Sequence, residues 1–566
     1  MCTYHSLLKN RLIIILALTS FYGMAQKPLH SLDKQIENIF EEWDKPGKPG
    51  ASVGIIQNGK MVYLNRFGNA DLENPTPVTK DTKFKLMALR NQIVAFAVLL
   101  LESEGKLSMN DDIRKYLPEM HEFEKPIRIH HLLTHTSGLP DFIMLQRLTG
   151  MQKKAQKTRE QTLKMLYNLT NKIFKSGDKA DYTDAGILLA SEIVAKIAQT
   201  PFKDFVTSRI FKPLGMTNTV FGDIDDTIIQ NRAQIYSRNG DTYKNESLNF
   251  YTIIDFAIYS NGEDMARWML NFSKPKIGNR TLINKMFKQT KLNNGQTVDI
   301  VPGQYMSNYK GLQKFQQHGR VYGNTTYIAH FPEQDFGIVV LGNAYDFRAK
   351  EAALKIADLF LEKEFKQAPI TKINIEKKKR EIIKLTDSKL KKFCGYYWND
   401  ASSYSRKIYL KDGKLFYFRS DGNESELAPI GKNTFVLTED PERYTITFEN
   451  QSGKEVMLFA VGDEYEYRNE KYAPVVYDSK QLLEFTGLFL CKNLKAVYRV
   501  EMQNGKLIAS TNNNNEIIIT PYKTDAFTSK ISYFSNLEYK RNDNGSIIGF
   551  IVKTSNVGSQ FFEKID

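Results

Sequence analysis

The spacing of apolar residues predicts a mixed unit of helices and strands in the N-terminal part of the chain. Residues 51–56 and 61–63 flank the turn Asn58-Gly59 and match a β-hairpin, and residues 337–343 form an apolar run typical of a buried strand. Three segments repeat apolar residues every three to four positions, the period of an amphipathic helix: residues 32–43, 187–198 and 349–361.

Two strongly apolar segments need separate interpretations. Residues 93–101 are too few for a membrane span, which needs roughly twenty residues, so we expect a buried helix there. Near the N-terminus, Lys9 and Arg11 precede a short apolar run that ends in small residues at Ala25. This pattern predicts a secretory signal peptide over residues 1–25. We therefore expect an exported chain, in the periplasm or outside the cell, with no transmembrane span after cleavage.

The C-terminal part of the chain contains an internal repeat. Eight residues recur at a constant offset of 92 positions: Phe393, Gly395, Gly413, Lys414, Leu415, Pro429, Phe435 and Gly453. Each copy has short alternating strands and glycine-containing turns, which predicts two small antiparallel barrels or sandwiches. The resulting division of the chain is a first domain over 26–370, a charged linker over 371–388, and β modules over 389–475 and 481–566.

Charge and cysteine content limit the possible functions. The formal net charge is +14, and removing Lys9 and Arg11 with the signal peptide leaves +12. We find no groove motif of arginine and lysine with interleaved aromatics, so a nucleic-acid partner is not expected, and a basic surface with affinity for anionic envelope polymers is the simpler interpretation. Cys394 and Cys491 would remain in the mature chain and could pair in an oxidising compartment.

Several motifs occur in the order known from one enzyme family. They include Tyr116-Leu117-Pro118-Glu119, the run from His131 through Thr136-Ser137-Gly138-Leu139-Pro140 to Asp141, and Pro213-Leu214-Gly215-Met216-Thr217-Asn218. The chain thereby resembles the serine β-lactamase and penicillin-binding-protein-like family, particularly its class C and esterase-like branch. The resemblance implies an α+β fold, with an antiparallel sheet flanked by helices and a helical subdomain. The β modules resemble the lipocalin-like modules often appended to this family.

The catalytic motif of the resembled family is altered here. In that family the buried helix opens with Ser-x-x-Lys, in which the serine attacks a carbonyl and the lysine takes up its proton. Ala88 stands at the serine position and Asn91 at the lysine position, and no Ser, Thr or Cys occurs from Phe84 to Leu101. The sequence therefore predicts a site without the family's nucleophile.

Two further family motifs are changed in part. Tyr182-Thr183-Asp184 keeps the tyrosine of Tyr-x-Asn, and we align His318-Gly319-Arg320 with Lys/His-x-Gly, so that Arg320 fills the side-chain-free position. Without the lysine, the Tyr182 phenol should stay protonated near neutrality. The resemblance brings six residues to one polar cavity: Arg90, Asn91, Tyr182, Asp184, His318 and Arg320. Asp184 and Arg320 could form an ion pair that closes the cleft, or Arg320 could hold a ligand carboxylate.

These observations favour a non-catalytic, exported member of the family that acts by binding. A peptidoglycan fragment, a D-amino-acid peptide or another anionic small ligand would suit the pocket, and a protein partner in the cell envelope is also possible. Two alternatives remain open, an active hydrolase with an atypical nucleophile and an interaction module that acts through the β repeats. No cofactor is expected, and no histidine spacing typical of a zinc site is present.

Overall fold

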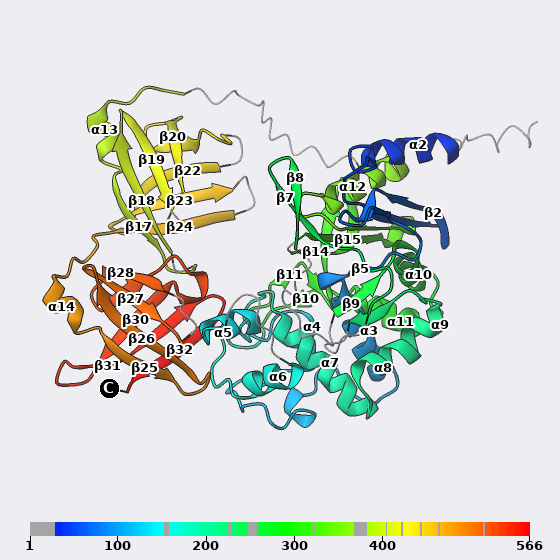
Figure 1. Ribbon diagram of the computed structural model, residues 1–566, viewed down its shortest axis with the longest axis horizontal. Coiled ribbons are helices and arrows are strands. Elements are labelled where there is room, and N and C mark those ends of the chain that lie inside the picture. Colours follow the sequence, from blue (N-terminus) through cyan, green and yellow to red (C-terminus); the bar gives the residue numbers. More distant parts are fainter. Residues whose placement is uncertain are drawn as a thin grey trace, which may run out of the picture.

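A computed structural model provides the three-dimensional arrangement. It describes residues 29–151, 158–222, 228–246, 257–321, 323–366, 382–402, 404–419, 423–441, 444–461, 465–512 and 516–565. The expected signal peptide, residues 1–25, and most of the expected linker, 371–388, lie outside the described residues. The described chain forms a unit of sheet and helices followed by two closed barrels, which confirms the expected fold class (Figure 1).

The central element of the first unit is a seven-stranded antiparallel sheet. Strand order across the sheet is β12 (Ile300–Val301), β13 (Gln304–Tyr309), β14 (Leu312–Val321), β15 (Asn324–Phe331), β16 (Phe336–Gly342), β1 (Ala51–Gln57) and β2 (Lys60–Phe67). The expected hairpin and the expected buried strand are therefore β1–β2 and β16. Every residue of β15 and β16 is buried, because helices cover both faces of the sheet, and this explains the continuous apolar run.

Helices pack on both faces of this sheet. On one face, α12 (Ala349–Leu361) matches the expected helix, and α2 (Leu29–Phe40) lies beside it. The expected helix over 32–43 ends earlier, at Phe40, because residues 41–43 form a turn. On the opposite face lie α10 (Gly262–Ser273) and α3 (Arg90–Ser103), and α3 contains the apolar run that we expected to be buried.

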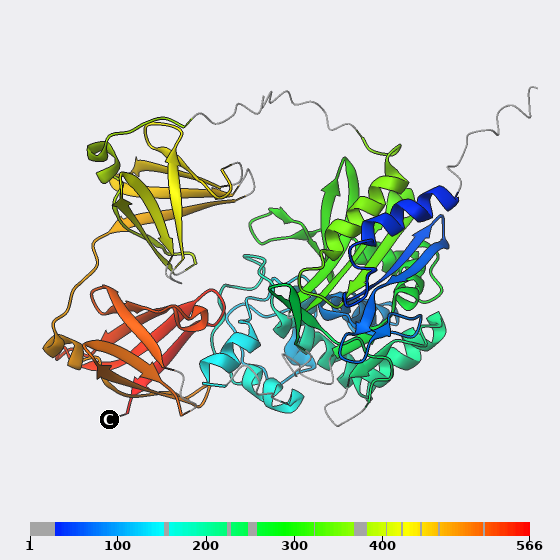
Figure 2. The same ribbon diagram turned by 45° about the horizontal axis from the view of Figure 1, so that its top comes forward.

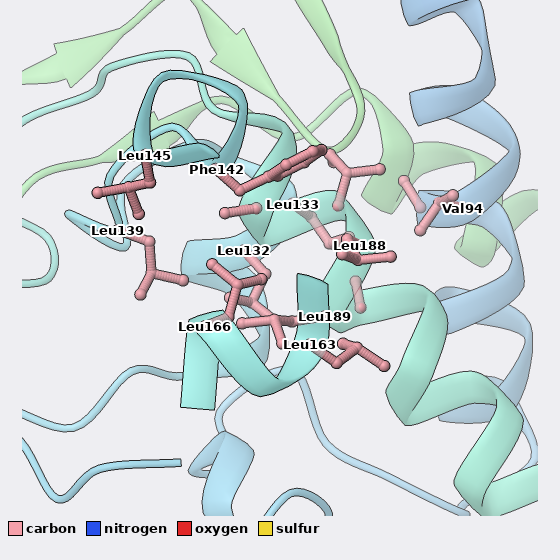
Figure 3. Close-up of a cluster of buried hydrophobic side chains, with 14 of the residues drawn as sticks. Val94, Leu132, Leu133, Leu139, Phe142, Leu145, Leu163, Leu166, Leu188 and Leu189 are labelled. Atoms are coloured by element: carbon pink, nitrogen blue, oxygen red, sulfur yellow. The ribbon is translucent and has the colours of Figure 1, made fainter. Parts of the chain in front are cut away.

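A helical subdomain extends from α3 and shares a leucine-rich core with it (Figure 3). Its helices are α4 (Ile129–Leu133), α5 (Phe142–Leu148), α6 (Arg159–Tyr167), α7 (Asp184–Ala198), α8 (Phe202–Val206), α9 (Lys212–Leu214) and α11 (Arg280–Met286). Short turns are η1 (Met87–Leu89), η2 (Ile113–Lys115), η3 (Thr207–Phe211) and η5 (Pro332–Gln334). Small sheets pair β3 (Asn69–Asp71) with β4 (Thr76–Pro77), β7 (Tyr236–Asn239) with β8 (Thr242–Asn245), β10 (Thr290–Lys291) with β11 (Thr297–Val298), and β9 (Ala257–Ser260) with β5 (Phe84–Lys85) and β6 (Val220–Gly222).

The C-terminal repeat forms two closed eight-stranded barrels, each preceded by a short helix. Barrel 1 comprises α13 (Asp387–Lys391), β17 (Gly395–Asn399), β18 (Tyr404–Lys411), β19 (Lys414–Arg419), β20 (Glu424–Pro429), β21 (Thr434–Leu437), β22 (Tyr444–Gln451), β23 (Lys454–Val461) and β24 (Tyr465–Tyr472). Barrel 2 comprises α14 (Ser479–Leu483), β25 (Gly487–Cys491), β26 (Ala496–Gln503), β27 (Lys506–Ser510), β28 (Ile517–Lys523), β29 (Ala526–Thr528), η6 (Ser532–Phe534), β30 (Asn536–Arg541), β31 (Ile547–Thr554) and β32 (Gly558–Lys564). Pairing among the first four strands keeps the offset of 92 residues.

One end of barrel 2 packs against the helical subdomain (Figure 2). The Asp141 N–H, at the start of α5, donates to the Asn556 carbonyl at 2.9 Å. Asn493 donates from its side chain to the Thr170 hydroxyl at 3.0 Å. These contacts, with apolar packing between α5 and η6, make the barrel core continuous with the core of the helical subdomain.

Two further expectations concern cysteines and the membrane. Cys394 and Cys491 are both free thiols in the structure, so the possible disulfide between them is not formed. Cys491 is buried in the core of barrel 2. Among the helices that the structure describes, none combines the length and the apolar character that crossing a bilayer requires.

Equivalent pairs of phenylalanines pack inside each of the two barrels. Phe435 contacts Phe393 with ring centroids 5.1 Å apart, and its repeat counterpart Phe527 contacts Phe485 at 4.7 Å. Both Phe435 and Phe527 are fully buried. We expect Phe435→Ala and Phe527→Ala each to destabilise their own barrel by about 3–5 kcal/mol, because each leaves a cavity. Hydrogen exchange measured barrel by barrel checks this, and equal loss of protection in both barrels from one substitution would contradict it.

Candidate functional site

The start of α3 lies directly against strand β14. Ala88 is in the turn η1, just before the helix, and Met87 beside it has a positive φ of 52°. A Cβ atom at Gly319 would lie only 2.4 Å from the Met87 Cβ and 3.2 Å from the Ala88 nitrogen. The close approach of β14 to η1 therefore requires glycine at this position.

Four side chains form a polar network beside Ala88. The Arg90 guanidinium pairs with the Asp184 carboxylate at 2.6 Å and donates to the Met87 carbonyl at 3.1 Å. The Tyr182 hydroxyl donates to the same Asp184 carboxylate at 2.9 Å, and the Asn91 amide lies 3.4 Å from that hydroxyl. The structure thus brings together Ala88, Arg90, Asn91, Tyr182 and Asp184 as the sequence predicted, but Asp184 pairs with Arg90 and not with Arg320.

Tyr182 is not suited to act as a base. Its ring is 38% exposed, but its hydroxyl is directed inward to Asn91 and Asp184. Burial and then the Asp184 charge raise the pKa of the Tyr182 phenol well above its ordinary value. A phenol with a raised pKa is protonated at neutral pH, as we expected from the missing lysine.

The placement of His318 and Arg320 corrects the expected cavity. His318 pairs across the strands with Tyr327, whose side chain belongs to the core beneath α12, so His318 and Arg320 face α12 and not α3. The Arg320 guanidinium donates to the Tyr345 carbonyl at 3.0 Å and stacks on the Tyr345 ring. Burial and two nearby lysines lower the pKa of His318. Neither residue reaches the polar network around Ala88.

Gln317 and Gly319 are the residues of β14 that face the site, because successive side chains of a strand point to opposite faces. The Gln317 amide donates to the Gly303 carbonyl at 3.1 Å. Arg320 lies on the other face, so it does not fill the space beside η1 as we expected. The alternation of β14 against its apolar neighbours was the signal that could have revealed this.

Sequence reasoning also missed His135. Its backbone has a positive φ of 54°, and its ring contacts the Tyr182 ring with centroids 4.5 Å apart. Its Nδ1 lies 3.2 Å from the Thr183 carbonyl. Burial lowers the pKa of His135 to about 4, so this buried ring is neutral and positions the segment that carries Tyr182.

Metal-binding groups are not assembled in the described part of the chain, where no three His, Cys, Asp or Glu side chains converge. His130 and His131 lie on the short helix α4. The His131 Nδ1 accepts from the Arg128 N–H at 3.1 Å, and burial lowers the pKa of His131 to about 3. His131 therefore stabilises the start of a helix.

Comparison with known proteins identifies the class to which this fold and site belong. A sequence profile described as Beta-lactamase matches residues 36–360, more than half of the chain. The chain belongs to the β-lactamase family. This confirms the resemblance to β-lactamases and penicillin-binding proteins that the motifs indicated.

Individual relatives extend the comparison. Penicillin-binding protein 4* of Bacillus subtilis (strain 168) is 24% identical over 451 residues, 76% of this chain and 98% of the relative. The octameric penicillin-binding protein homologue from Pyrococcus abyssi superimposes with a TM-score of 0.53 at 21% identity, over 78% of this chain and all of that one. D-amino acid amidase from Ochrobactrum anthropi SV3 superimposes with a TM-score of 0.51 at 20% identity, over 59% of this chain and 99% of the amidase.

Asp184 should contribute strongly to stability. The side chains of Arg90 and Asp184 are only 14% and 17% exposed, so Asp184→Asn leaves a buried cation without its carboxylate. We expect a loss of about 2–4 kcal/mol in the free energy of unfolding, measured by urea denaturation. As a matched control, Glu351→Gln breaks the exposed Arg348–Glu351 pair and should cost less than about 0.5 kcal/mol. Equal effects of the two substitutions would contradict a buried pair.

His135 predicts a pH dependence of stability. Its folded pKa of about 4 lies below the ordinary value of about 6.5, so between these pH values the unfolded state binds a proton that the folded state does not. Stability from His135 is complete above pH ~6.5 and falls by about 1.4 kcal/mol per pH unit on acidification. In His135→Asn the slope between pH 4 and 6.5 should be reduced, whereas substituting the exposed His121 should leave it unchanged. An unaltered slope in His135→Asn would rule out this assignment.

Proposed function

We propose that this protein is an exported, non-catalytic member of the β-lactamase family that binds a peptide containing D-amino acids, such as a peptidoglycan fragment, without cleaving it. The observation that carries the proposal is Ala88 at the start of α3, where the family's serine attacks its substrate. Asn91 replaces the lysine, and the raised pKa of Tyr182 removes the remaining candidate for the base.

The same geometry supports binding. Among the described strands, β13 pairs with β14 only from Leu312 to Gln316, so the backbone edge of the following residues beside η1 could take an extended peptide. The Tyr182 ring offers an exposed aromatic surface, and Arg90 is already neutralised by Asp184, so the site gives no strong preference for anions. The amidase and the penicillin-binding relatives support the choice of D-amino-acid peptides as candidate ligands.

A covalent-labelling experiment tests the absence of catalysis. After incubation with a fluorescent β-lactam or a fluorophosphonate, intact-mass measurement should find no adduct on the wild-type protein. Ala88→Ser with Asn91→Lys should acquire labelling at least about tenfold above that background, because the new lysine would replace an amide that already lies 3.4 Å from the Tyr182 hydroxyl. A stoichiometric adduct on any wild-type residue would favour the alternative, an active hydrolase with an atypical nucleophile.

A calorimetric titration tests the binding itself. With an acyl-D-alanyl-D-alanine peptide, wild-type protein should release or absorb heat without hydrolysis, and Tyr182→Ala should weaken binding by about tenfold because it removes the exposed ring. Arg320→Ala is the matched control, because Arg320 lies on the other face of the sheet and should not affect binding. No binding, or equal weakening by both substitutions, would exclude the proposed site.

A further inference from the structure

One end of barrel 1 has an unusual interior. Side chains alternate along each strand, so a residue two or four positions from an inward-facing core residue also points into the barrel. At the end of barrel 1 where β23 stops, such residues follow the apolar core (Figure 1). We name this end the mouth of barrel 1. Its inward-facing residues include large aromatic and charged side chains, in contrast to the apolar core behind them: Tyr404, Arg406, Tyr417, Arg419, Phe459 and Tyr467.

The side chains of the mouth hold one another in place. The Arg406 guanidinium stacks 3.7 Å from the Tyr404 ring centre and donates to the Tyr417 hydroxyl at 2.8 Å. The Tyr417 and Phe459 rings are stacked at 5.5 Å, and the Tyr467 ring is 6.3 Å from Phe459. The mouth is therefore an ordered aromatic surface with hydrogen-bonding groups among its rings.

Arg419 at the mouth is held by an ion pair and a hydrogen bond. Arg419 pairs with Glu439 at 3.2 Å and donates to the Ser425 hydroxyl at 2.9 Å. The Ser425 hydroxyl in turn donates to Glu439 at 2.7 Å. Charged groups held in this way present fixed donors and acceptors to a neutral, polar ligand.

The internal repeat shows how far this end has diverged. At the offset of 92 residues, Ala496, Tyr498, Ala509 and Thr511 of barrel 2 correspond to Tyr404, Arg406, Tyr417 and Arg419. In barrel 2 this end lies against the helical subdomain. In barrel 1 the same end stays partly exposed, with Tyr467 36% accessible. Two of the four residues in barrel 2 are alanines, whereas barrel 1 has large aromatic or charged side chains at all four positions.

A buried, unpaired oxygen lies just inside the mouth. Asn469 is fully buried two residues beyond Tyr467, opposite Met457 in the barrel core. Its amide nitrogen donates to the Met457 and Tyr467 carbonyls at 3.1 and 2.9 Å. Its Oδ1 has no hydrogen-bond partner among the described residues. Buried polar atoms are rarely left unpaired, so this oxygen marks a polar position within the otherwise apolar interior behind the mouth.

We propose that the mouth of barrel 1 is a saccharide-binding site. A sugar has flat C–H faces that pack on aromatic rings and hydroxyls that bond to fixed polar groups, and the mouth provides both. A lipid does not fit, because the apolar side chains of Leu415, Phe435 and Phe448 already fill the interior behind the mouth. This site is separate from the proposed peptide site in the first domain.

The test is calorimetry on the full chain with four oligosaccharides, namely chitotetraose, cellotetraose, tetragalacturonate and a mannuronate tetramer, and with decanoate as a lipid probe. We expect at least one oligosaccharide to bind. Tyr467→Ala should weaken that binding by about tenfold, whereas Tyr467→Phe keeps the ring and should stay within about threefold. Tyr409→Ala removes a tyrosine from the outer face of β18 and is the matched control, expected to have no effect.

Several outcomes would overturn the proposal. They are binding of none of the four oligosaccharides, unchanged affinity in Tyr467→Ala, equal weakening in Tyr409→Ala, or displacement of the saccharide by decanoate. A thermal melt of each variant establishes that the barrels remain folded. Tyr182→Ala should leave saccharide binding unchanged, which separates failure of this site from failure of the proposed peptide site.

Discussion

The close contact between η1 and β14 organises the first domain. A side chain at Gly319 would collide with Met87, and the Thr326 hydroxyl on the next strand donates to the Leu86 carbonyl at 3.2 Å. This contact fixes where the buried helix α3 enters the core between the sheet and the helical subdomain. Because the first turn of α3 carries Arg90 and Asn91, the same contact determines which groups can meet Tyr182 and Asp184. Fold and site thus depend on one glycine.

Loss of the catalytic pair has left a self-sufficient polar network. A lysine at position 91 would have placed a cation beside the Tyr182 hydroxyl, and Arg90 now supplies the positive charge one residue earlier, paired with Asp184 at 2.6 Å. The Tyr182 hydroxyl bonds to the same carboxylate, so the buried charges are compensated within the site. Such a network stabilises the arrangement of α3 and α7, and burial keeps the pKa of the Tyr182 phenol well above its ordinary value.

The fold was largely predictable from sequence, and the site only in part. Apolar periodicity identified α12 and the β1–β2 hairpin because burial imposes it directly. Ala88 and Asn91 could be placed because an ungapped run connects them to recognisable motifs. The face of β14 that carries His318 and Arg320 could not be predicted, because it depends on how the strand is oriented between α3 and α12 in the folded domain. The Arg90–Asp184 pair joins residues 94 positions apart and depends on tertiary packing.

The two barrels illustrate how one scaffold diverges when only one copy is docked. Equivalent phenylalanine pairs fill both interiors, so the stability of each barrel depends on the same aromatic packing. At the end that meets the helical subdomain, barrel 2 has Ala496 and Ala509, which are buried in the core that the two share. Barrel 1 has no such constraint on the corresponding end, yet Tyr404 and Arg406 there are held in specific contacts. Ordering large side chains at a partly exposed end costs conformational entropy. Contacts with a bound ligand would offset that cost.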